Sequence, residues 1–234
     1  MNILIPMCGE GKRFKEKFNI PKPLVSVRGK TITEWAVESL NQDGNYIFLC
    51  RTDHLKYGLD KLLRKLKPEC TILYVDHTTE GAACTALLAK PLIDSDEPLL
   101  IANCDQYIEY NKEKFENLLA KDPSGIIFTF GPTQDPKWSY AALSGNRVME
   151  VAETDPTCSE WATCGIYAFR QGRDFVKYAE QMIRRNIRTN NEYYLCPAYN
   201  EFIDDGKLIM SLKVDTMVGL GDVDSIKLFE QTSG

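Results

Sequence analysis

The sequence contains only two histidines and no C-x-x-C pair, so the usual ligand sets for zinc are missing. It has no apolar run long enough to span a membrane, and its first residues lack the basic segment and apolar core of a signal peptide. The net charge of −5 excludes the broad basic surface that non-specific nucleic-acid binding requires. These absences predict a cytoplasmic protein that binds neither nucleic acid nor a membrane.

The eight cysteines show no spacing typical of a metal site. Several stand inside apolar runs, such as Cys50 in "YIFLC" and Cys104 in "LLIANC". Free cysteine behaves as a small buried hydrophobe, and disulfides are rare in reducing compartments. We therefore expect reduced, mostly buried thiols, and a disulfide framework is the less favoured alternative.

The chain has 234 residues, of which 44% are hydrophobic and 26% charged, ordinary values for a globular protein. This length suits one large α/β domain, and no repeat, linker or low-complexity tract divides it. We expect a single domain over residues 1–234, in which the pattern changes between a first half, about 1–130, and a second half, about 131–234.

The first half alternates apolar strand-like segments with amphipathic helical ones. Strands are expected at 3–7, 46–50, 70–75, 98–103 and 125–130, and helices at 31–40, 55–66, 80–93 and 111–121. Thr31 and Glu34 have the spacing of a helix capping box. Residues 8–30 show no helical period and are expected to form a long loop. The alternation predicts a mostly parallel sheet with helices on both faces.

The second half begins with a different pattern. We expect a hairpin over residues 140–153, turning at Gly145 and Asn146. The remaining elements are expected as strands at 164–169 and 208–214 and helices at about 172–187, 191–204 and 222–230. Together the two halves predict an α/β protein with one mixed sheet flanked by helices.

A glycine-rich segment, "GEGKRF", follows the first strand. It fails the Walker A pattern at Pro6 and Arg13, and it fails the dinucleotide-binding fingerprint at Phe14. Gly9 and Gly11 still allow backbone N–H groups to approach a phosphate closely. Open α/β sheets bind ligands beyond the carboxyl ends of their strands, which is where this turn lies.

Five basic residues lie between Lys12 and Lys22, in a chain that is acidic overall. Arg13 offers a planar fork for phosphate oxygens. Lys22 is enclosed by Pro21 and Pro23, and a residue before proline is pushed toward extended geometry. A stiff backbone delivers a charge without reorganisation. A flexible basic loop is the alternative, but the combination favours a site for a strongly anionic ligand.

These motifs, read together as "GEGKRF…PKPLVSVRGKTITEWAVESL", resemble the start of the sugar-1-phosphate nucleotidyltransferases, the nucleotide-sugar pyrophosphorylases. The resemblance covers essentially the whole chain, although its specific motifs lie mainly in the first half. It implies a Rossmann-like fold of the nucleotidyltransferase or GT-A-like type, with nucleotide bound by the first half and an acceptor by the second. It also implies that Arg13 contacts the triphosphate and Lys22 the phosphates of the reacting complex. Lys12 stands where threonine is usual.

The segment "PLLIANCDQYI" places Asp105 just beyond a buried strand. In the resembling family an aspartate at this point holds Mg²⁺, and magnesium binds through one or two carboxylates plus substrate phosphates. The alternative is that Asn103 and Asp105 only cap a turn. We therefore expect Mg²⁺ as the cofactor, with Asp105 as its ligand and as a catalytic residue.

Further residues follow from the resemblance with less specific motifs. "DHTTEGAACTAL" resembles the segment that packs against the nucleotide base, so Gly81 and Asp76 are expected at the nucleotide, together with Gly9, Gly11 and Lys12. The acceptor side is expected at Tyr140, Glu153, Gly165 and Glu192. Each of these acceptor residues could equally be an ordinary residue of the fold.

Two departures from the family pattern stand out. Thr154 replaces a lysine that contacts the sugar phosphate, and Gly219 occupies the position of the second metal carboxylate. Asp222 or Asp224 could substitute for that carboxylate, or one metal site could be weak. The base, the acceptor and the oligomeric state, a homo-oligomer included, stay open.

The reaction implied is attack of an acceptor phosphate on an NTP, giving a nucleotide sugar, for example for surface polysaccharide synthesis, and pyrophosphate. A phosphate monoester has its second pKa at about 6, so no general base is required. A cytidylyltransferase for a non-sugar phosphomonoester such as phosphocholine is an alternative, and a non-catalytic regulatory paralogue is another. A nucleotide-sugar-dependent glycosyltransferase is disfavoured because its Asp-x-Asp motif is interrupted at Tyr107.

Overall fold

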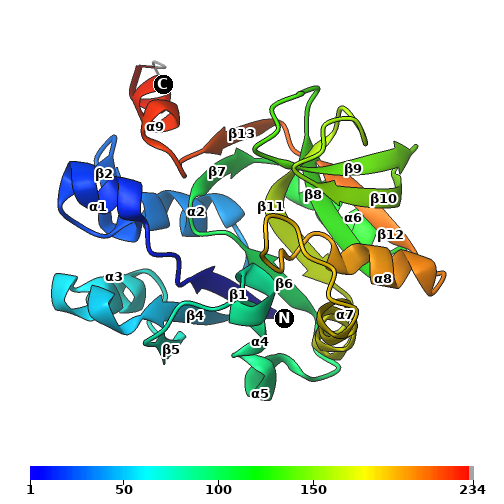
Figure 1. Cartoon of the computed structure of the whole chain (residues 1–234), viewed down its shortest axis with the longest axis horizontal. Helices are drawn as coiled ribbons and strands as arrows, with labels where there is room; N and C mark the ends of the chain where they lie inside the picture. The colour runs from blue at the N-terminus through cyan, green and yellow to red at the C-terminus, as the bar shows by residue number, and fades with distance from the viewer. Residues whose placement is uncertain (232–234) are drawn as a thin grey trace.

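A nine-stranded mixed sheet forms the centre of the computed structural model, which describes residues 1–231 (Figure 1). The side chains of Lys12, Arg13 and Lys15 are outside the described part. The strands of this sheet are β1 (Asn2–Met7), β4 (Asn45–Arg51), β5 (Thr71–Val75), β6 (Leu99–Ala102), β8 (Gly125–Phe130), β9 (Ser139–Ser144), β10 (Arg147–Glu153), β11 (Ala162–Phe169) and β12 (Ile209–Lys213). Their order across the sheet is β5-β4-β1-β6-β11-β8-β12-β10-β9.

Strand direction changes across the sheet. Strands β5, β4, β1 and β6 are parallel, and so are β8 and β12. Strand β11 lies between β6 and β8 and runs antiparallel to both, while β10 pairs antiparallel with β9 and β12. The second half of the chain therefore inserts a strand between two strands of the first half, so the antiparallel part is larger than the β-α alternation alone indicates.

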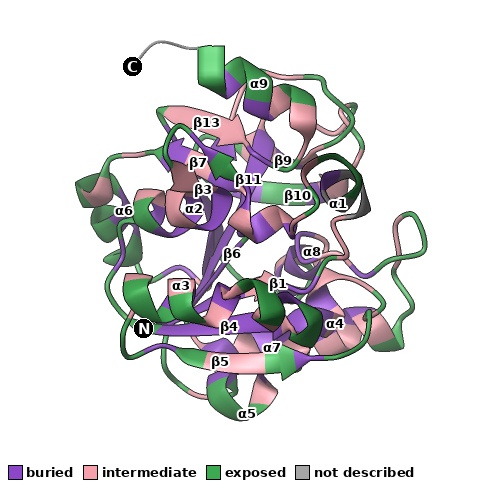
Figure 2. Cartoon of the chain, turned by 90° about the vertical axis from the view of Figure 1, so that its left-hand side faces the viewer, coloured by how far each residue is buried: buried purple, intermediate pink, exposed green. Residues whose placement is uncertain are grey.

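Helices cover both faces of the sheet, as the sequence predicts. One face packs against α2 (Ile32–Leu40), α3 (Leu59–Leu66) and α6 (Lys112–Leu119). The other packs against α4 (Ala82–Leu87), α5 (Lys90–Ile93), α7 (Gly172–Arg184) and α8 (Ala198–Asp204). Figure 2 shows the result: the central strands are mostly buried, and the outward sides of the helices are exposed.

Pro6 is the second-last residue of β1, which ends at Met7 as the sequence predicts. Strand β4 pairs with all of β1, whereas β6 pairs only with Asn2, Ile3 and Leu4. Pro6 therefore has a ladder partner on one side only. The strand continues past it because a proline is tolerated where pairing on one side has ended.

The expectation of a long loop over residues 8–30 is wrong. The segment forms α1 (Lys12–Phe18), the 3-10 turn η1 (Lys22–Leu24) and a small hairpin of β2 (Ser26–Val27) and β3 (Lys30–Thr31). Phe14 and Phe18 lie one helical turn apart, with ring centroids 5.8 Å from each other. Phe14 is buried in a cluster with residues of the C-terminal helix α9 (Val223–Gln231). Tertiary packing therefore stabilises a helix too short to be stable alone.

Three other expected helices are shorter or divided. The 3-10 turn η2 (Thr52–Tyr57) precedes α3, and the two are separated at Gly58, whose φ of +80° suits glycine. The segment 80–93 divides into α4 and α5. Of the expected helix 191–204, only α8 forms, and it begins at Ala198 with Pro197 as its N-cap residue.

A second small sheet, which the sequence does not predict, pairs β7 (Gln106–Glu109) with β13 (Thr216–Gly219) in antiparallel register. Gly219 faces Gln106 across this ladder. Just beyond it, the backbone N–H of Leu220 donates to the carbonyl oxygen of Asp105 at 2.7 Å. This ladder therefore brings the last part of the chain next to the carboxyl end of β6.

Within residues 1–231, no helix combines the length and apolar character that a membrane crossing requires. The eight cysteines are free thiols, and all are buried except Cys84 and Cys158, which are half-buried. The expected burial of the thiols is confirmed. Burial raises the pKa of the Cys8 thiol to about 11, so this thiol stays protonated near neutral pH.

Candidate functional site

Two cavities open side by side beyond the carboxyl ends of β1 and β6. The glycine cavity, of about 650 Å³, is lined by Gly9, Gly11 and Gly81 among others. The aromatic cavity, of about 320 Å³, is lined by Trp138, Tyr167 and Tyr194 among others. Ala82 and Gly221 line both cavities, so the two share a wall.

The glycine cavity is built largely from backbone and small side chains. Its further lining residues are Pro6, Cys8, Glu10, Phe14, Lys22, Thr78, Thr79, Ala82, Thr85, Glu192 and Gly221. Gly11 has a φ of +58°, and an added Cβ there would lie 3.4 Å from the Cβ of Lys22. The turn after β1 thus holds Gly11 directly against the Pro-Lys-Pro segment, as a backbone cradle for an anion requires.

Gly81 joins this cavity to the loop before α8. Its φ is +133°, and an added Cβ would lie 2.4 Å from the carbonyl oxygen of Tyr193. The N–H of Tyr193 donates to the carbonyl oxygen of Glu80 at 2.8 Å, and the N–H of Ala83 donates to that of Tyr193 at 3.0 Å. Only glycine fits this close approach of two backbones.

Lys22 does not have the extended geometry that the prolines were expected to impose. Pro21 is extended, with φ −60° and ψ 141°, and Lys22 begins the 3-10 turn η1. The turn is closed by the N–H of Leu24 donating to Pro21 at 3.0 Å and that of Val25 donating to Lys22 at 3.1 Å. These hydrogen bonds, with the burial of both prolines, still hold the lysine on a rigid segment.

An ion pair lies where the two cavities meet. The Lys22 Nζ atom is 2.6 Å from Oδ2 of Asp105, and the two side chains are 24% and 22% exposed. Lys22 lines the glycine cavity, Asp105 lines the aromatic cavity, and both line a smaller cavity between β1 and β6. The pair brings together the predicted phosphate-binding lysine and the predicted metal-binding aspartate, although 83 positions separate them in the sequence.

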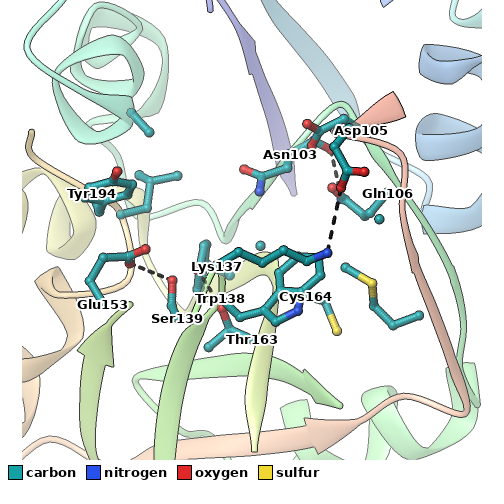
Figure 3. A pocket seen from close by; sticks show the side chains of 18 residues that line it. Asn103, Asp105, Gln106, Lys137, Trp138, Ser139, Glu153, Thr163, Cys164 and Tyr194 are labelled. Carbon is teal, nitrogen blue, oxygen red and sulfur yellow. Dashed lines mark hydrogen bonds and ion pairs between the residues drawn. The ribbon is translucent and has the colours of Figure 1, made fainter. Parts of the chain in front are cut away.

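The aromatic cavity is built mainly from side chains (Figure 3). Its further lining residues are Ala82, Asn103, Asp105, Gln106, Lys137, Ser139, Glu153, Thr163, Cys164, Gly165, Leu195, Met217, Gly219, Gly221 and Asp222. Figure 3 shows Glu153 and Tyr194 on one side of this cavity and Asp105 and Gln106 on the other. The cavity therefore has an acidic group at each end and aromatic rings along its walls.

Glu153 is the titratable group at the end of the aromatic cavity that lies away from Asp105. Burial raises the pKa of its carboxyl to about 7, partly offset by the hydrogen bond that Ser139 Oγ donates to Oε2 at 2.6 Å. Ser139 and Glu153 are register partners across the β9-β10 hairpin, which fixes both side chains at the cavity. Near neutral pH this carboxyl is therefore divided between its protonated and ionised forms.

A Bifunctional protein GlmU from a Thermotoga species is 26% identical over 208 residues, which is 86% of this chain and 44% of the relative. The chain thus spans about half the length of the curated relatives it matches. No protein-family model matches the sequence.

Among solved structures, a nucleoside-diphosphate-sugar pyrophosphorylase from Vibrio cholerae superposes with a TM-score of 0.82 at 22% identity, covering 98% of this chain and 100% of that one. An inositol-1-phosphate CTP transferase from T. maritima superposes with a TM-score of 0.75 at 14% identity, covering 100% and 97%. This chain is similar to the sugar-1-phosphate nucleotidyltransferases. The resemblance predicted from the sequence and the Rossmann-like α/β fold are confirmed.

Two residues expected at the nucleotidyltransferase site lie outside both cavities. Asp76 is exposed after β5 and is bonded to Nδ1 of His77 at 2.8 Å. Tyr140 is fully buried, and its hydroxyl donates to the carbonyl oxygen of Asp135 at 2.8 Å. Successive side chains of a strand point to opposite faces, so Ser139 rather than Tyr140 faces the cavity. Neither residue lines a cavity described above, so the expected contacts of Asp76 and Tyr140 with ligands stay predictions.

The other expected residues divide between the two cavities. Gly165 lines the aromatic cavity with φ +70°, and an added Cβ would lie 2.1 Å from Nδ2 of Asn103. Glu192, expected on the acceptor side, lines the glycine cavity instead, because the residues after it pair with the segment that begins at Glu80. Lys12 and Arg13 lie at the start of α1, but their side chains are outside the described residues.

The position of the second metal carboxylate in the family, Gly219, is crowded by the Trp138 ring. An added Cβ there would lie 2.9 Å from Cη2 of Trp138. Asp222 lines the aromatic cavity, but its carboxylate accepts from the N–H of Ser225 at 2.8 Å and from its Oγ at 2.6 Å. Asp224 is exposed and paired with Lys227 at 3.0 Å. Of the two aspartates that could replace the missing carboxylate, only Asp222 lines the cavity, and it also caps the start of α9.

Sequence reasoning missed Gln106, Trp138 and Lys137 among the lining residues of the aromatic cavity. Gln106 is 3% exposed, and its Nε2 donates to the carbonyl oxygen of Asn103 at 2.9 Å, while its buried Oε1 has no partner among the described residues. Trp138 and Lys137 come from the loop before β9. No motif marks these positions, although a lysine beside a tryptophan in a polar loop is a weak signal of a binding surface.

Proposed function

We propose that this chain is a magnesium-dependent nucleotidyltransferase that couples an NTP to a phosphorylated acceptor, with sugar 1-phosphates as the first acceptor class. The Lys22–Asp105 ion pair at the shared boundary of the two cavities carries this proposal. It supports a nucleotide bound in the glycine cavity and an acceptor bound in the aromatic cavity. The two phosphates then meet beside Asp105, consistent with a nucleotide half and an acceptor half of one domain.

In the proposed reaction, an acceptor phosphate oxygen attacks the α-phosphorus of the NTP. The new P–O bond forms as the bond to the β-phosphate oxygen breaks, and pyrophosphate leaves with that electron pair. Lys22 neutralises charge on the phosphates, and the N–H groups of the turn at Gly9 and Gly11 orient them. The acceptor phosphate is largely deprotonated at neutral pH, so no side chain has to remove a proton.

Asp105 fits a magnesium ligand. Its carboxylate already attracts a cation, the Lys22 ammonium, at 2.6 Å. No group of three His, Cys, Asp or Glu side chains that could hold a metal ion occurs among the described residues, so substrate phosphates would have to complete the ligand set. When bound, Mg²⁺ would supply charge neutralisation at the phosphates, with Asp105 as its carboxylate ligand and Asp222 as a neighbour.

The walls of the aromatic cavity bear on the identity of the acceptor. Glu153, Gln106 Oε1 and Thr163 offer hydrogen-bond acceptors for the hydroxyl groups of a sugar. The Tyr194 ring beside the Glu153 carboxyl also suits a cationic head group, which favours a phosphomonoester such as phosphocholine as the second candidate. An NDP-sugar product would serve surface polysaccharide synthesis, and the reduced thiols are consistent with a cytoplasmic enzyme.

The test is magnesium-dependent pyrophosphate release, with each common NTP crossed against sugar 1-phosphates, phosphocholine and other phosphomonoesters. We expect release with one NTP–acceptor pair and a loss of about 10²- to 10³-fold in Lys22→Ala, because a charge that faces the phosphates is removed. Lys121→Ala, which removes an exposed lysine after α6, is the matched control and should keep full activity.

Three outcomes separate the candidates. Release that requires Lys22 names both substrates and supports the transferase. Nucleotide binding without release for any acceptor would contradict the sugar and phosphocholine candidates. Absence of NTP binding, measured by calorimetry with MgATP, MgCTP, MgGTP and MgUTP, would contradict catalysis and favour the regulatory paralogue.

A further inference from the structure

One cation lines the aromatic cavity among its described lining residues, and it is Lys137. Its side chain is 46% exposed, and Figure 3 shows it extending across the cavity toward the side on which Asp105 lies. Lys22, the other lysine near Asp105, lines the glycine cavity. The two ammonium groups therefore approach the boundary between the cavities from opposite sides.

The backbone fixes where Lys137 enters the cavity. The N–H of Thr154, at the end of β10, donates to the carbonyl oxygen of Trp138 at 3.1 Å. The next residues, Ser139 and Glu153, are register partners in the β9-β10 hairpin. The loop that carries Lys137 is thus hydrogen-bonded to the strand that carries Glu153. The Lys137 side chain extends from this loop toward the end of the cavity opposite Glu153.

The Lys137 ammonium is held by carboxylates and by a ring. Its Nζ lies 3.3 Å from Oδ2 of Asp135, 3.7 Å from Oδ2 of Asp222 and 5.0 Å from the centroid of the Trp138 ring. Trp138 in turn packs against Gly219, where a side chain would collide with it. The indole ring therefore fills the space beside Gly219, and its face lies next to the Lys137 ammonium.

Asp222 links this lysine to the boundary of the cavities. It follows Gly221, where an added Cβ would lie 2.8 Å from Oδ2 of Asp105. The N–H of Leu220 donates to the carbonyl oxygen of Asp105 at 2.7 Å. A backbone hydrogen bond and a close contact with the Asp105 carboxylate thus hold the segment before Asp222 against Asp105.

An acceptor phosphate has to reach the α-phosphate of a nucleotide beside Asp105, and its own double negative charge needs a cation on the acceptor side. We propose that Lys137 binds the phosphate of the acceptor and thereby sets the preference of this cavity for phosphomonoesters. The proposal rests on the proposed function. Lys137 takes up the acceptor phosphate in place of its weaker, partly exposed contacts with Asp135 and Asp222.

The test compares steady-state kinetics of the wild type, Lys137→Met and Lys137→Arg on the best NTP–acceptor pair of the pyrophosphate assay. For Lys137→Met we expect the KM for the acceptor to rise about 10- to 100-fold, because a charge-assisted contact is lost. The KM for the magnesium nucleotide should stay within about twofold, because Lys22 serves that side. Lys137→Arg should restore most of the acceptor affinity.

Lys213→Met is the matched control. Lys213 is also exposed and lies 4.0 Å from the centroid of a tryptophan ring, that of Trp161, but it lines neither cavity. We expect both KM values of this variant to equal those of the wild type. It shows whether loss of a lysine from a tryptophan face alters the kinetics by itself.

An unchanged acceptor KM in Lys137→Met, or an equal rise in both KM values, would overturn the assignment while leaving the proposed function intact. A wild type that releases no pyrophosphate with any substrate pair would instead overturn the proposed function, and this assignment with it. The two failures are therefore distinguishable in one series of measurements.

Discussion

The glycine cavity and the aromatic cavity share a wall but are built in different ways. The glycine cavity takes much of its lining from backbone and small residues in two short segments, one after β1 and one before α4. The aromatic cavity collects large side chains from segments spread between Ala82 and Asp222. A backbone surface suits phosphates, which every nucleotide carries, whereas side chains can be exchanged to fit different acceptors. Selectivity for the acceptor is therefore expected to lie in the aromatic cavity.

The largest effect is expected from Asp105→Asn, because Asp105 lies where both cavities meet. The variant loses the proposed metal carboxylate and the partner of Lys22, so kcat should fall by about 10³-fold. The measurement is pyrophosphate release at saturating concentrations of both substrates. Asp94→Asn, which changes an exposed aspartate after α5, is the control. A loss of less than tenfold would remove Asp105 from the reaction.

A smaller effect, confined to the glycine cavity, is expected from Gly81→Ala. The added Cβ would meet the Tyr193 backbone at a φ that is almost restricted to glycine, so the free energy of unfolding should fall by about 2–3 kcal/mol. Gly11→Ala, whose Cβ would meet only ordinary contacts, should cost about 1 kcal/mol. Urea unfolding of both variants measures the difference, and equal losses would contradict the proposed role of the close approach.

The smallest effect is a pH dependence confined to the aromatic cavity. Burial raises the pKa of Glu153 from 4.5 to about 7, so the folded protein holds a proton that the unfolded chain releases above pH 4.5. This contribution to stability is complete below pH 4.5 and is lost as the pH rises through 7. The wild type should therefore lose stability relative to Glu153→Gln between pH 5 and 8. Parallel curves from urea unfolding across this range would contradict the raised pKa.

The same Glu153 prediction sharpens the question of the acceptor. A cationic head group favours the ionised carboxyl. The KM for a cationic acceptor should therefore fall as the pH rises through 7 in the wild type and stay flat in Glu153→Gln. The hydroxyl groups of a sugar make no such demand. A KM for a sugar 1-phosphate that followed the ionisation of Glu153 would weaken this distinction.

The fold class could be predicted from the sequence because its signals are local. The capping box formed by Thr31 and Glu34 is present at the start of α2, and the alternation of strands and helices gives the two covered faces of the sheet. Helix α1 was missed because its only apolar residues, Phe14 and Phe18, are balanced by charged neighbours and it packs on distant parts of the chain. Such a helix has no sequence period long enough to detect.

The residues of the candidate site likewise divide into those that the sequence predicts and those that it does not. Gly9, Gly11 and Lys22 belong to one continuous segment, so their convergence could be expected from the sequence. Lys137 and Gln106 reach the aromatic cavity through the loop before β9 and through the β7-β13 ladder, which depend on long-range pairing. Asp76 lies outside both cavities because it is exposed after β5, and Tyr140 because one step along a strand changes the face.

The packing of α9 against the segment after β1 also bears on how the molecule folds. Phe14 and Val25 share one small apolar cluster with Ile226 and Phe229, which come from the opposite end of the sequence. Closing so long a loop is entropically costly, and contacts of this kind form late. The strands can therefore assemble before the C-terminal helix docks. The segment that carries Lys22, already bonded to α2 through Thr33 and Ile32, is expected to gain its last apolar contacts in that final step of folding.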